Sequence, residues 1–234
     1  MNKWFVSVVI MSSLLLGTLM MSSPDKTEAA VRQNVVKLFS EDGSCSGVRI
    51  KYKKSFFVLT AGHCRPLQSG SFIMARGSDG RTESLTVLAE SDDSDLLLLS
   101  NPRNDGVDLS DSWALNEKVF SMTHGGGKPA YRTDGELLNT ELVSIPLFEI
   151  KDSKGMKKCS EFSKLTPEFY SFGGLVCSIR SLVVASTVAV IPGSSGGGVF
   201  NASGDLVAIV SGMGGGFSVL VPLENIKSFL KKRK

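Results

Sequence analysis

The chain has 234 residues, of which 42% are hydrophobic and 21% charged, and its formal net charge is +3 at pH 7. This composition excludes a disordered chain and provides a core for one large domain or two small ones. The small net charge gives no reason to expect a strongly anionic partner such as nucleic acid.

The N-terminus has the organisation of an export signal. A lysine precedes the apolar run Trp4–Met21, and a polar stretch with small residues follows it. We predict a signal peptide over residues 1–29, cleaved before Ala30, and a secreted or periplasmic protein. The alternative is an uncleaved membrane anchor at residues 4–21, because a helix of that length spans about 27 Å.

After residue 30, short apolar or alternating runs are separated by clusters of Gly, Asp, Asn and Ser. In the run SGVRIKY, Val48, Ile50 and Tyr52 alternate with charged or small residues, which is the period of a half-buried strand. At least ten such runs predict an all-β barrel or sandwich design.

The turn-rich segment Ser100–Trp113 divides these runs into two sets of similar size. We therefore expect a first β-domain over residues 30–112 and a second over residues 113–234. The only convincing helical pattern is at the C-terminus, where the apolar residues of Leu223–Leu230 share one face and a basic tail follows.

Four cysteines lie beyond the export signal. An even number in an exported chain favours two disulfides, although four cysteines allow three connectivities. We expect no metal site and no cofactor, since the chain has no C-x-x-C pair and only two histidines. The cysteines are Cys45, Cys64, Cys159 and Cys177.

Three short patterns carry residues with catalytic chemistry. The sequence FFVLTAGHCRP places His63 directly after an apolar strand, and SDDSDLLLLS places Asp95 directly before four leucines. The sequence PGSSGGGVF presents Ser195 among glycines, which leave room for a ligand. Asp92 and Asp93 are weaker candidates than Asp95, because they lie earlier in the polar turn. These are the parts of a nucleophilic triad.

Each of these residues has a physical role in acyl transfer. A serine hydroxyl is a weak nucleophile, so a base such as His63 must take the proton of Ser195 as it attacks. A buried carboxylate at Asp95 would hold the correct tautomer and stabilise the imidazolium. The backbone N–H groups of Gly193 and Ser195 would bind the developing oxyanion.

The blocks L-T-A-G-H-C, D-L-L-L-L and P-G-S-S-G-G, in this order, resemble the signature of the chymotrypsin-like serine proteases. The resemblance covers Val35 to about Phe229. It implies two six-stranded antiparallel β-barrels with a C-terminal helix and a catalytic site between the barrels. It also implies a disulfide between Cys45 and Cys64, whereas Cys159 and Cys177 match no family pair and by their spacing would close a loop of the second barrel.

The chain departs from the digestive members of this family in one respect. Those enzymes have an aspartate directly before the nucleophile, which pairs with a newly cut N-terminus. Here Ser194 stands at that position, and the exported start has no matching motif. The chain therefore resembles the heat-shock-type and viral members, which lack this activation mechanism.

The resemblance also implies which residues contact the substrate. The residue that is an aspartate in trypsin-like members is Ala189, so we expect a small or apolar side chain before the cleaved bond. His124 is interpreted as a loop histidine, or alternatively as a contributor near the pocket. The walls of the primary pocket are expected to be Ala189, Val190, Ile191, Ser211, Gly212 and Met213.

Together these features predict an exported, monomeric serine endopeptidase that acts on proteins or peptides. A membrane is a partner only if the N-terminal segment stays uncleaved. One alternative is a catalytically silent, protease-like protein that binds a surface or anionic partner. Another is ester or other acyl transfer by the same residues.

Overall fold

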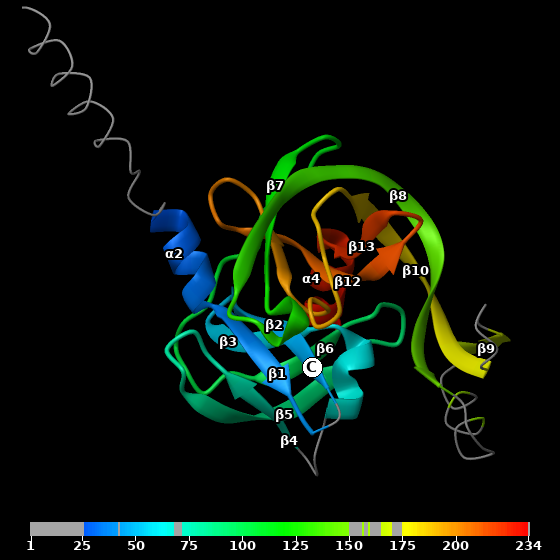
Figure 1. Cartoon of the computed structure of the whole chain (residues 1–234), viewed down its shortest axis with the longest axis horizontal. Coiled ribbons are helices and arrows are strands. Elements are labelled where there is room, and N and C mark those ends of the chain that lie inside the picture. Colours follow the sequence, from blue (N-terminus) through cyan, green and yellow to red (C-terminus); the bar gives the residue numbers. More distant parts are fainter. Residues whose placement is uncertain are drawn as a thin grey trace, which may run out of the picture.

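The computed structural model describes residues 26–41, 43–67, 72–149, 156, 159, 165–169 and 175–233. Two units of β-structure lie against each other, and helices α2 (Lys26–Gln33) and α4 (Leu223–Lys232) flank the strands in the chain (Figure 1). Two short 3₁₀ helices, η1 (Gly62–Leu67) and η2 (Gly125–Gly127), follow β3 and β7.

The first unit is a closed antiparallel barrel of six strands among the described residues, in the order β1-β2-β3-β6-β5-β4. The predicted strand SGVRIKY is part of β2, where Val48 and Ile50 are fully buried and pair with Leu59 and Phe57 of β3. The strand is not half-buried as predicted, because Arg49, between them, is fully buried too. The strands are β1 (Val35–Phe39), β2 (Ser44–Tyr52), β3 (Ser55–Thr60), β4 (Phe72–Arg76), β5 (Thr82–Glu90) and β6 (Leu97–Ser100).

The second unit is a seven-stranded sheet within the described residues, in the order β13-β12-β11-β7-β8-β10-β9. An additional pairing of β10 with β13 closes six of these strands into a ring. The strands are β7 (Lys118–Thr123), β8 (Tyr131–Glu149), β9 (Leu165–Phe169), β10 (Leu175–Ser186), β11 (Gly198–Phe200), β12 (Leu206–Gly214) and β13 (Phe217–Pro222).

These two units confirm the predicted all-β fold with two barrels and a C-terminal helix. The structure differs from the predicted two barrels in strand β9. This strand pairs with the first half of β10, at Leu175–Ile179, and so adds to the ribbon that β8 and β10 form beyond the ring (Figure 1). The second half of β10 pairs with β13. One long strand therefore belongs to both the ring and the ribbon, which the alternating pattern of the sequence does not show.

Helix α4 packs on a core that both barrels share. Its buried residues are those of the predicted apolar face, Leu223, Ile226, Phe229 and Leu230. The core beneath them combines residues of the first barrel, such as Ile50, with residues of the second, such as Phe200. A shared apolar core holds the two barrels against each other and so determines the geometry at their junction.

Helix α2 is a feature that the sequence did not predict. Val31 is 1% exposed, and Glu28 forms ion pairs with Arg32 of the same helix, at 2.6 Å, and with Arg132 of β8, at 3.5 Å. These tertiary contacts, more than an apolar repeat, account for the helix. None of the helices in the described part of the chain combines the length and the apolar composition that a membrane span requires.

The predicted signal peptide lies mostly outside the described residues. Its last four residues, 26–29, belong to α2, so a cut before Ala30 would divide that helix. The cleavage site stays a prediction.

Candidate active site

His63 is positioned by the end of β3 and by a disulfide. After β3 ends at Thr60, the chain turns into η1, and Cys64 of this turn is bonded to Cys45 of β2. A side chain at Gly62 would place its Cβ 3.1 Å from Oδ1 of Asp95, so the glycine permits close approach of the two segments. This pairing of cysteines is the one that the family resemblance implied.

Asp95 is fully buried at the start of the leucine run that forms β6. Its Oδ1 accepts a hydrogen bond from the backbone N–H of His63, at 2.8 Å, and its Oδ2 lies 2.8 Å from Nδ1 of the same residue. The hydroxyl of Ser211 donates a third hydrogen bond to Oδ2, at 2.6 Å. Three donors compensate for the burial of this carboxylate, and they orient the imidazole.

The neighbouring carboxylates do not take part in this arrangement. Asp92 is exposed, and Asp93 pairs with Nζ of Lys232, at 2.5 Å. Of these three aspartates of the polar turn, Asp95 contacts His63.

The electrostatics of the pair favour its charged forms. Burial lowers the pKa of His63, but the charge and hydrogen bond of Asp95 outweigh this effect and leave the pKa raised above its ordinary 6.5. Burial likewise raises the pKa of Asp95, but the attraction of His63 and the three hydrogen bonds leave it lowered. Asp95 is therefore a carboxylate at neutral pH.

Ser195 lies in the turn between β10 and β11 and lines the same cavity as His63. Its hydroxyl donates a hydrogen bond to the backbone oxygen of Ser211, at 3.1 Å. In the described part of the chain no direct hydrogen bond joins Ser195 to His63. The structure thus brings the three predicted residues to one site, and the hydroxyl of Ser195 is hydrogen-bonded to the backbone of Ser211.

The backbone of the Ser195 turn has a conformation that favours glycine. Gly193 has a φ of +91°, which side chains rarely allow. Among the described residues, the N–H groups of Gly193 and Ser195 donate to no protein acceptor. The carbonyl of Pro192 is held by the N–H of Gly126, at 2.7 Å. Two N–H groups beside the hydroxyl are thus free to bind an anion.

The hydroxyl of Ser194 is hydrogen-bonded to uncharged groups. Its side chain is 1% exposed, and its hydroxyl lies 3.0 Å from that of Thr123 and 3.4 Å from that of Tyr131. It also accepts a hydrogen bond from the backbone N–H of Ile191, at 3.2 Å. Ser194 is therefore a buried member of the turn and is not exposed to the cavity.

The cavity that contains His63 and Ser195 has a volume of about 720 Å³. It includes Ser211, Gly212 and Met213, three of the residues predicted to contact the substrate. Most of the other lining residues were not predicted, because they come from the β8–β10 ribbon and from β13, whose place beside the site depends on the closure of the ring. Gly214 and Gly215 instead follow Met213 directly, at the end of β12 and in the turn after it. These additional residues are Glu141, Ser144, Ile145, Val183, Ala185, Gly214, Gly215, Phe217 and Val219.

The other predicted wall of the pocket lies elsewhere. Ala189 and Ile191 line a separate cavity of about 530 Å³, and Val190 is buried in the core of the second barrel. The turn that follows them is closed by a hydrogen bond from Ser194 N–H to the carbonyl of Ile191, at 2.9 Å. These three residues do not wall the cavity of Ser195.

His124 does not line the cavity either. It is 5% exposed, and its Nδ1 lies 3.0 Å from the carbonyl oxygen of Lys128. Burial lowers its pKa, and the nearby positive charges of Lys37 and Arg32 act in the same direction. The interpretation as a loop histidine fits this neutral, buried setting.

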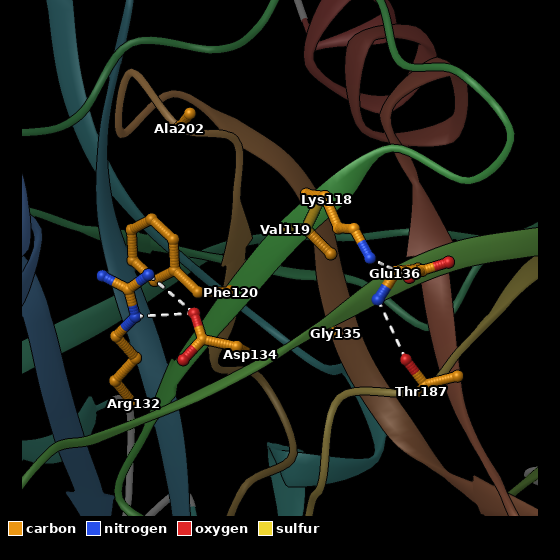
Figure 2. A pocket seen from close by; sticks show the side chains of 9 residues that line it. All are labelled: Lys118, Val119, Phe120, Arg132, Asp134, Gly135, Glu136, Thr187 and Ala202. Atoms are coloured by element: carbon orange, nitrogen blue, oxygen red, sulfur yellow. Dashed lines mark hydrogen bonds and ion pairs between the residues drawn. The ribbon is translucent and has the colours of Figure 1, made fainter.

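A further pocket, of about 410 Å³, lies over the paired strands β7 and β8, beside Thr187 and Ala202, and contains none of the predicted site residues (Figure 2). Figure 2 shows Arg132 beside the ring of Phe120, with its guanidinium bonded to Asp134. Lys118 forms an ion pair with Glu136. The charged side chains of this pocket are thus paired with each other.

The two disulfides of the structure are Cys45–Cys64 and Cys159–Cys177. The second bond ties Cys159, which lies between β8 and β9, to β10. No cysteine is free. Among the described residues no group of His, Cys, Asp and Glu could hold a metal ion.

Comparison with known proteins places this geometry in a family. The model of the trypsin-like peptidase domain matches residues 45–209. No curated relative matches the chain in sequence. Among solved structures, the active form of the Rv3671c protease from M. tuberculosis is similar with a TM-score of 0.65 and 17% identity, over 88% of this chain and 83% of that one.

Two further structures have the same fold. The HtrA-type protease AlgW with a tripeptide has a TM-score of 0.59 and 17% identity, over 88% of this chain and 60% of that one. The serine endoprotease from Yersinia pestis has a TM-score of 0.60 and 15% identity, over 90% and 67%. With the family model covering residues 45–209, the chain belongs to the trypsin-like peptidase family and is a serine endopeptidase.

Proposed function

We propose that His63, Asp95 and Ser195 hydrolyse peptide bonds through an acyl-enzyme. The observation that carries the proposal is the double hydrogen bond between His63 and Asp95, at 2.8 Å each, beside a cavity that Ser195 shares. Because Nδ1–H is held by the carboxylate, the unprotonated Nε2 is the nitrogen available as a base.

The reaction has two halves. Ser195 Oγ leaves the carbonyl of Ser211, gives its proton to Nε2 of His63, and bonds to the carbonyl carbon of the substrate. The imidazolium then gives this proton to the leaving amine as the C–N bond breaks. Water attacks the ester in the same way, with His63 again as the base, and Ser195 regains its proton.

The negative charge that develops on the substrate oxygen requires donors. We assign this role to the N–H groups of Gly193 and Ser195, which have no protein acceptor among the described residues. Removal of one such donor typically lowers kcat about 100-fold to 1000-fold. The positive φ of Gly193, +91°, suits a turn that directs its N–H toward the cavity.

The substrate is a peptide with a small or apolar residue before the cleaved bond. Support comes from the buried apolar members of the cavity, Ile145 and Val183, and from the partly buried Ala185 and Val219. The exposed members, which include Glu141, form its mouth. An apolar interior favours an apolar side chain of the substrate, because such a side chain has no hydrogen bonds with water to lose when it enters the cavity.

We further propose that the protein acts as a monomer outside the cytoplasm. The apolar run Trp4–Met21 and the two disulfides support export, because disulfides persist in oxidising compartments. Mass spectrometry of the exported protein would locate its N-terminus. A start at Ala30 would support the predicted cleavage, and a start at residue 1 in the membrane fraction would support the anchor instead.

Covalent labelling tests the catalytic proposal. A fluorophosphonate should modify Ser195, and Ser195→Ala should abolish both labelling and peptide cleavage. The exposed Ser203 offers a matched control, since Ser203→Ala should leave both unchanged. A folded protein that is inert to the reagent at every pH would be the silent binding protein. Cleavage of esters without cleavage of peptides would indicate other acyl transfer.

A further inference from the structure

Ser46 of the first barrel is bonded to the turn that carries Ser195. It follows Cys45 in β2 and is fully buried. Its backbone N–H donates to the carbonyl oxygen of Ser195, at 2.7 Å. Its hydroxyl donates to the carbonyl oxygen of Gly193, at 2.9 Å, and accepts from the backbone N–H of His124, at 2.8 Å. Ser46 thus binds two carbonyls of the turn that carries Ser195 and, in the neighbouring loop, the backbone N–H of His124.

The direction of these hydrogen bonds is determined by the partners. The N–H of His124 can only donate, so the oxygen of the Ser46 hydroxyl must accept from it. The carbonyl of Gly193 can only accept, so the single hydroxyl hydrogen must be directed to it. Both partners are backbone groups beside a fully buried side chain, and replacing the hydroxyl would leave them without this hydrogen bond.

The turn needs such external hydrogen bonds because a glycine leads it. Gly193 has a φ of +91°, and glycine has a low barrier to other conformations. A peptide group is planar and trans, so holding a carbonyl oxygen also determines the direction of the N–H in the same peptide. The Gly126–Pro192 hydrogen bond, at 2.7 Å, therefore orients the N–H of Gly193.

Ser46 acts on both peptides that flank the α-carbon of Gly193. Its hydroxyl holds the carbonyl of Gly193, which belongs to the following peptide, and so limits rotation about Gly193. Through His124 it also anchors the start of η2, the loop whose Gly126 holds the preceding peptide at Pro192. We infer that the Ser46 hydroxyl is a positioning residue that orients the oxyanion-binding N–H groups. This inference rests on the proposed function. The first barrel then contributes to the oxyanion site as well as the base and its carboxylate.

The test compares Ser46→Ala with a matched control in the full chain. Ser186 is also fully buried, donates its hydroxyl to a backbone carbonyl, that of Glu136 at 2.8 Å, and accepts from a backbone N–H, that of Val188 at 3.2 Å. It does not line the cavity of Ser195. Ser186→Ala therefore removes the same kinds of hydrogen bond away from the oxyanion turn.

For Ser46→Ala we expect kcat on a peptide substrate to fall about tenfold to 100-fold with KM nearly unchanged, a smaller loss than that of a direct donor. The affinity for a peptide boronate, which forms a tetrahedral adduct with the nucleophile, should fall by a similar factor. Ser186→Ala should change neither quantity. Ser46→Thr retains a hydroxyl, so its kcat should exceed that of Ser46→Val, which has the same shape without one.

Other results would overturn the inference. A folded Ser46→Ala with native kcat and native boronate affinity would exclude a role in the oxyanion site. Equal kcat for Ser46→Thr and Ser46→Val would do the same. If Ser46→Ala and both other variants fail to fold while Ser186→Ala folds, Ser46 is a structural residue instead. Failure of the proposed function itself would appear separately, as a native protein that a fluorophosphonate does not label.

Discussion

Asp95 and His63 are joined by two hydrogen bonds, one to the backbone N–H and one to Nδ1 of the histidine, and both are 2.8 Å long. The backbone bond holds the carboxylate in place, and the ring bond orients the imidazole. The hydroxyl of Ser211 adds a third donor, at 2.6 Å. This arrangement depends on a group that only accepts hydrogen bonds at both oxygens.

Asp95→Asn should retain the shape of the site and lose most of the activity. An amide presents one donor group, so it cannot accept from all three partners, and it favours the wrong tautomer of His63. We expect kcat on a peptide substrate to fall by a factor on the order of 10,000. The exposed Asp92 provides the control, because Asp92→Asn should leave kcat unchanged. Activity within tenfold of native in Asp95→Asn would contradict the triad.

The pH dependence of kcat/KM follows from the raised pKa of His63. Only the neutral imidazole can accept the proton of Ser195, so activity is low below this pKa and rises as the pH passes through it. We expect the midpoint of the rise to lie above 6.5. A profile of kcat/KM between pH 5 and 9 measures it. A midpoint clearly below 6.5 would mean that burial of His63 outweighs Asp95.

Arg49 is a buried cation on which the first barrel depends. Its guanidinium lies 3.1 Å from Glu83 and 3.6 Å from Asp105, and its side chain is fully buried. Arg49→Ala removes the ion pair of Asp105 and one of the two arginine partners of Glu83, which keeps Arg103, and it opens a cavity, so the free energy of unfolding should fall by about 2–5 kcal/mol. Urea unfolding measures the change.

Arg81 serves as the control for Arg49, because its side chain is 81% exposed and its ion pair with Asp79 is 3.8 Å long. Arg81→Ala should change the free energy of unfolding by less than about 1 kcal/mol. Similar values for the two variants would show that the buried ion pairs of Arg49 contribute little.

Gly196→Ala should prevent the two barrels from meeting at the active site. Gly196 has a φ of +81°, and a Cβ there would overlap Oγ1 of Thr60 and the backbone oxygen of Ser46. Neither neighbour can move freely, because each belongs to a strand of the first barrel. We expect loss of soluble, folded protein, measured by circular dichroism and size-exclusion chromatography.

Gly214 is the matched control, since a Cβ there would have its nearest neighbour at 3.7 Å. Gly214→Ala should fold normally. A normally folded Gly196→Ala would show that the turn can adopt another conformation without disturbing the barrel.

Much of the fold is predictable because it depends on local patterns. The alternation of apolar residues in β2 predicts a strand. The spacing of the apolar residues in α4 predicts a helix with one buried face, formed by Leu223, Ile226, Phe229 and Leu230. Helix α2 and strand β9 were not predicted. Glu28 of α2 is stabilised by Arg132, which is far away in the chain, and such a contact leaves no periodic pattern. Strand β9 pairs with the neighbouring β10, but its sequence LTPEF is short and contains a proline, which argues against a strand.

The sequence by itself determined most of the barrel strands and the terminal helix, and it singled out His63, Asp95 and Ser195 as the proposed catalytic residues, because each of these features is specified within about ten neighbouring residues. Only the tertiary structure decided which side chains surround them. It places the ribbon residues Val183 and Ile145 in the cavity and turns Ile191 away from it. Cavity walls and hydrogen-bond partners such as Ser46 and Gly193 form when distant strands close into barrels, and the register of that closure is set by the packing of the whole chain.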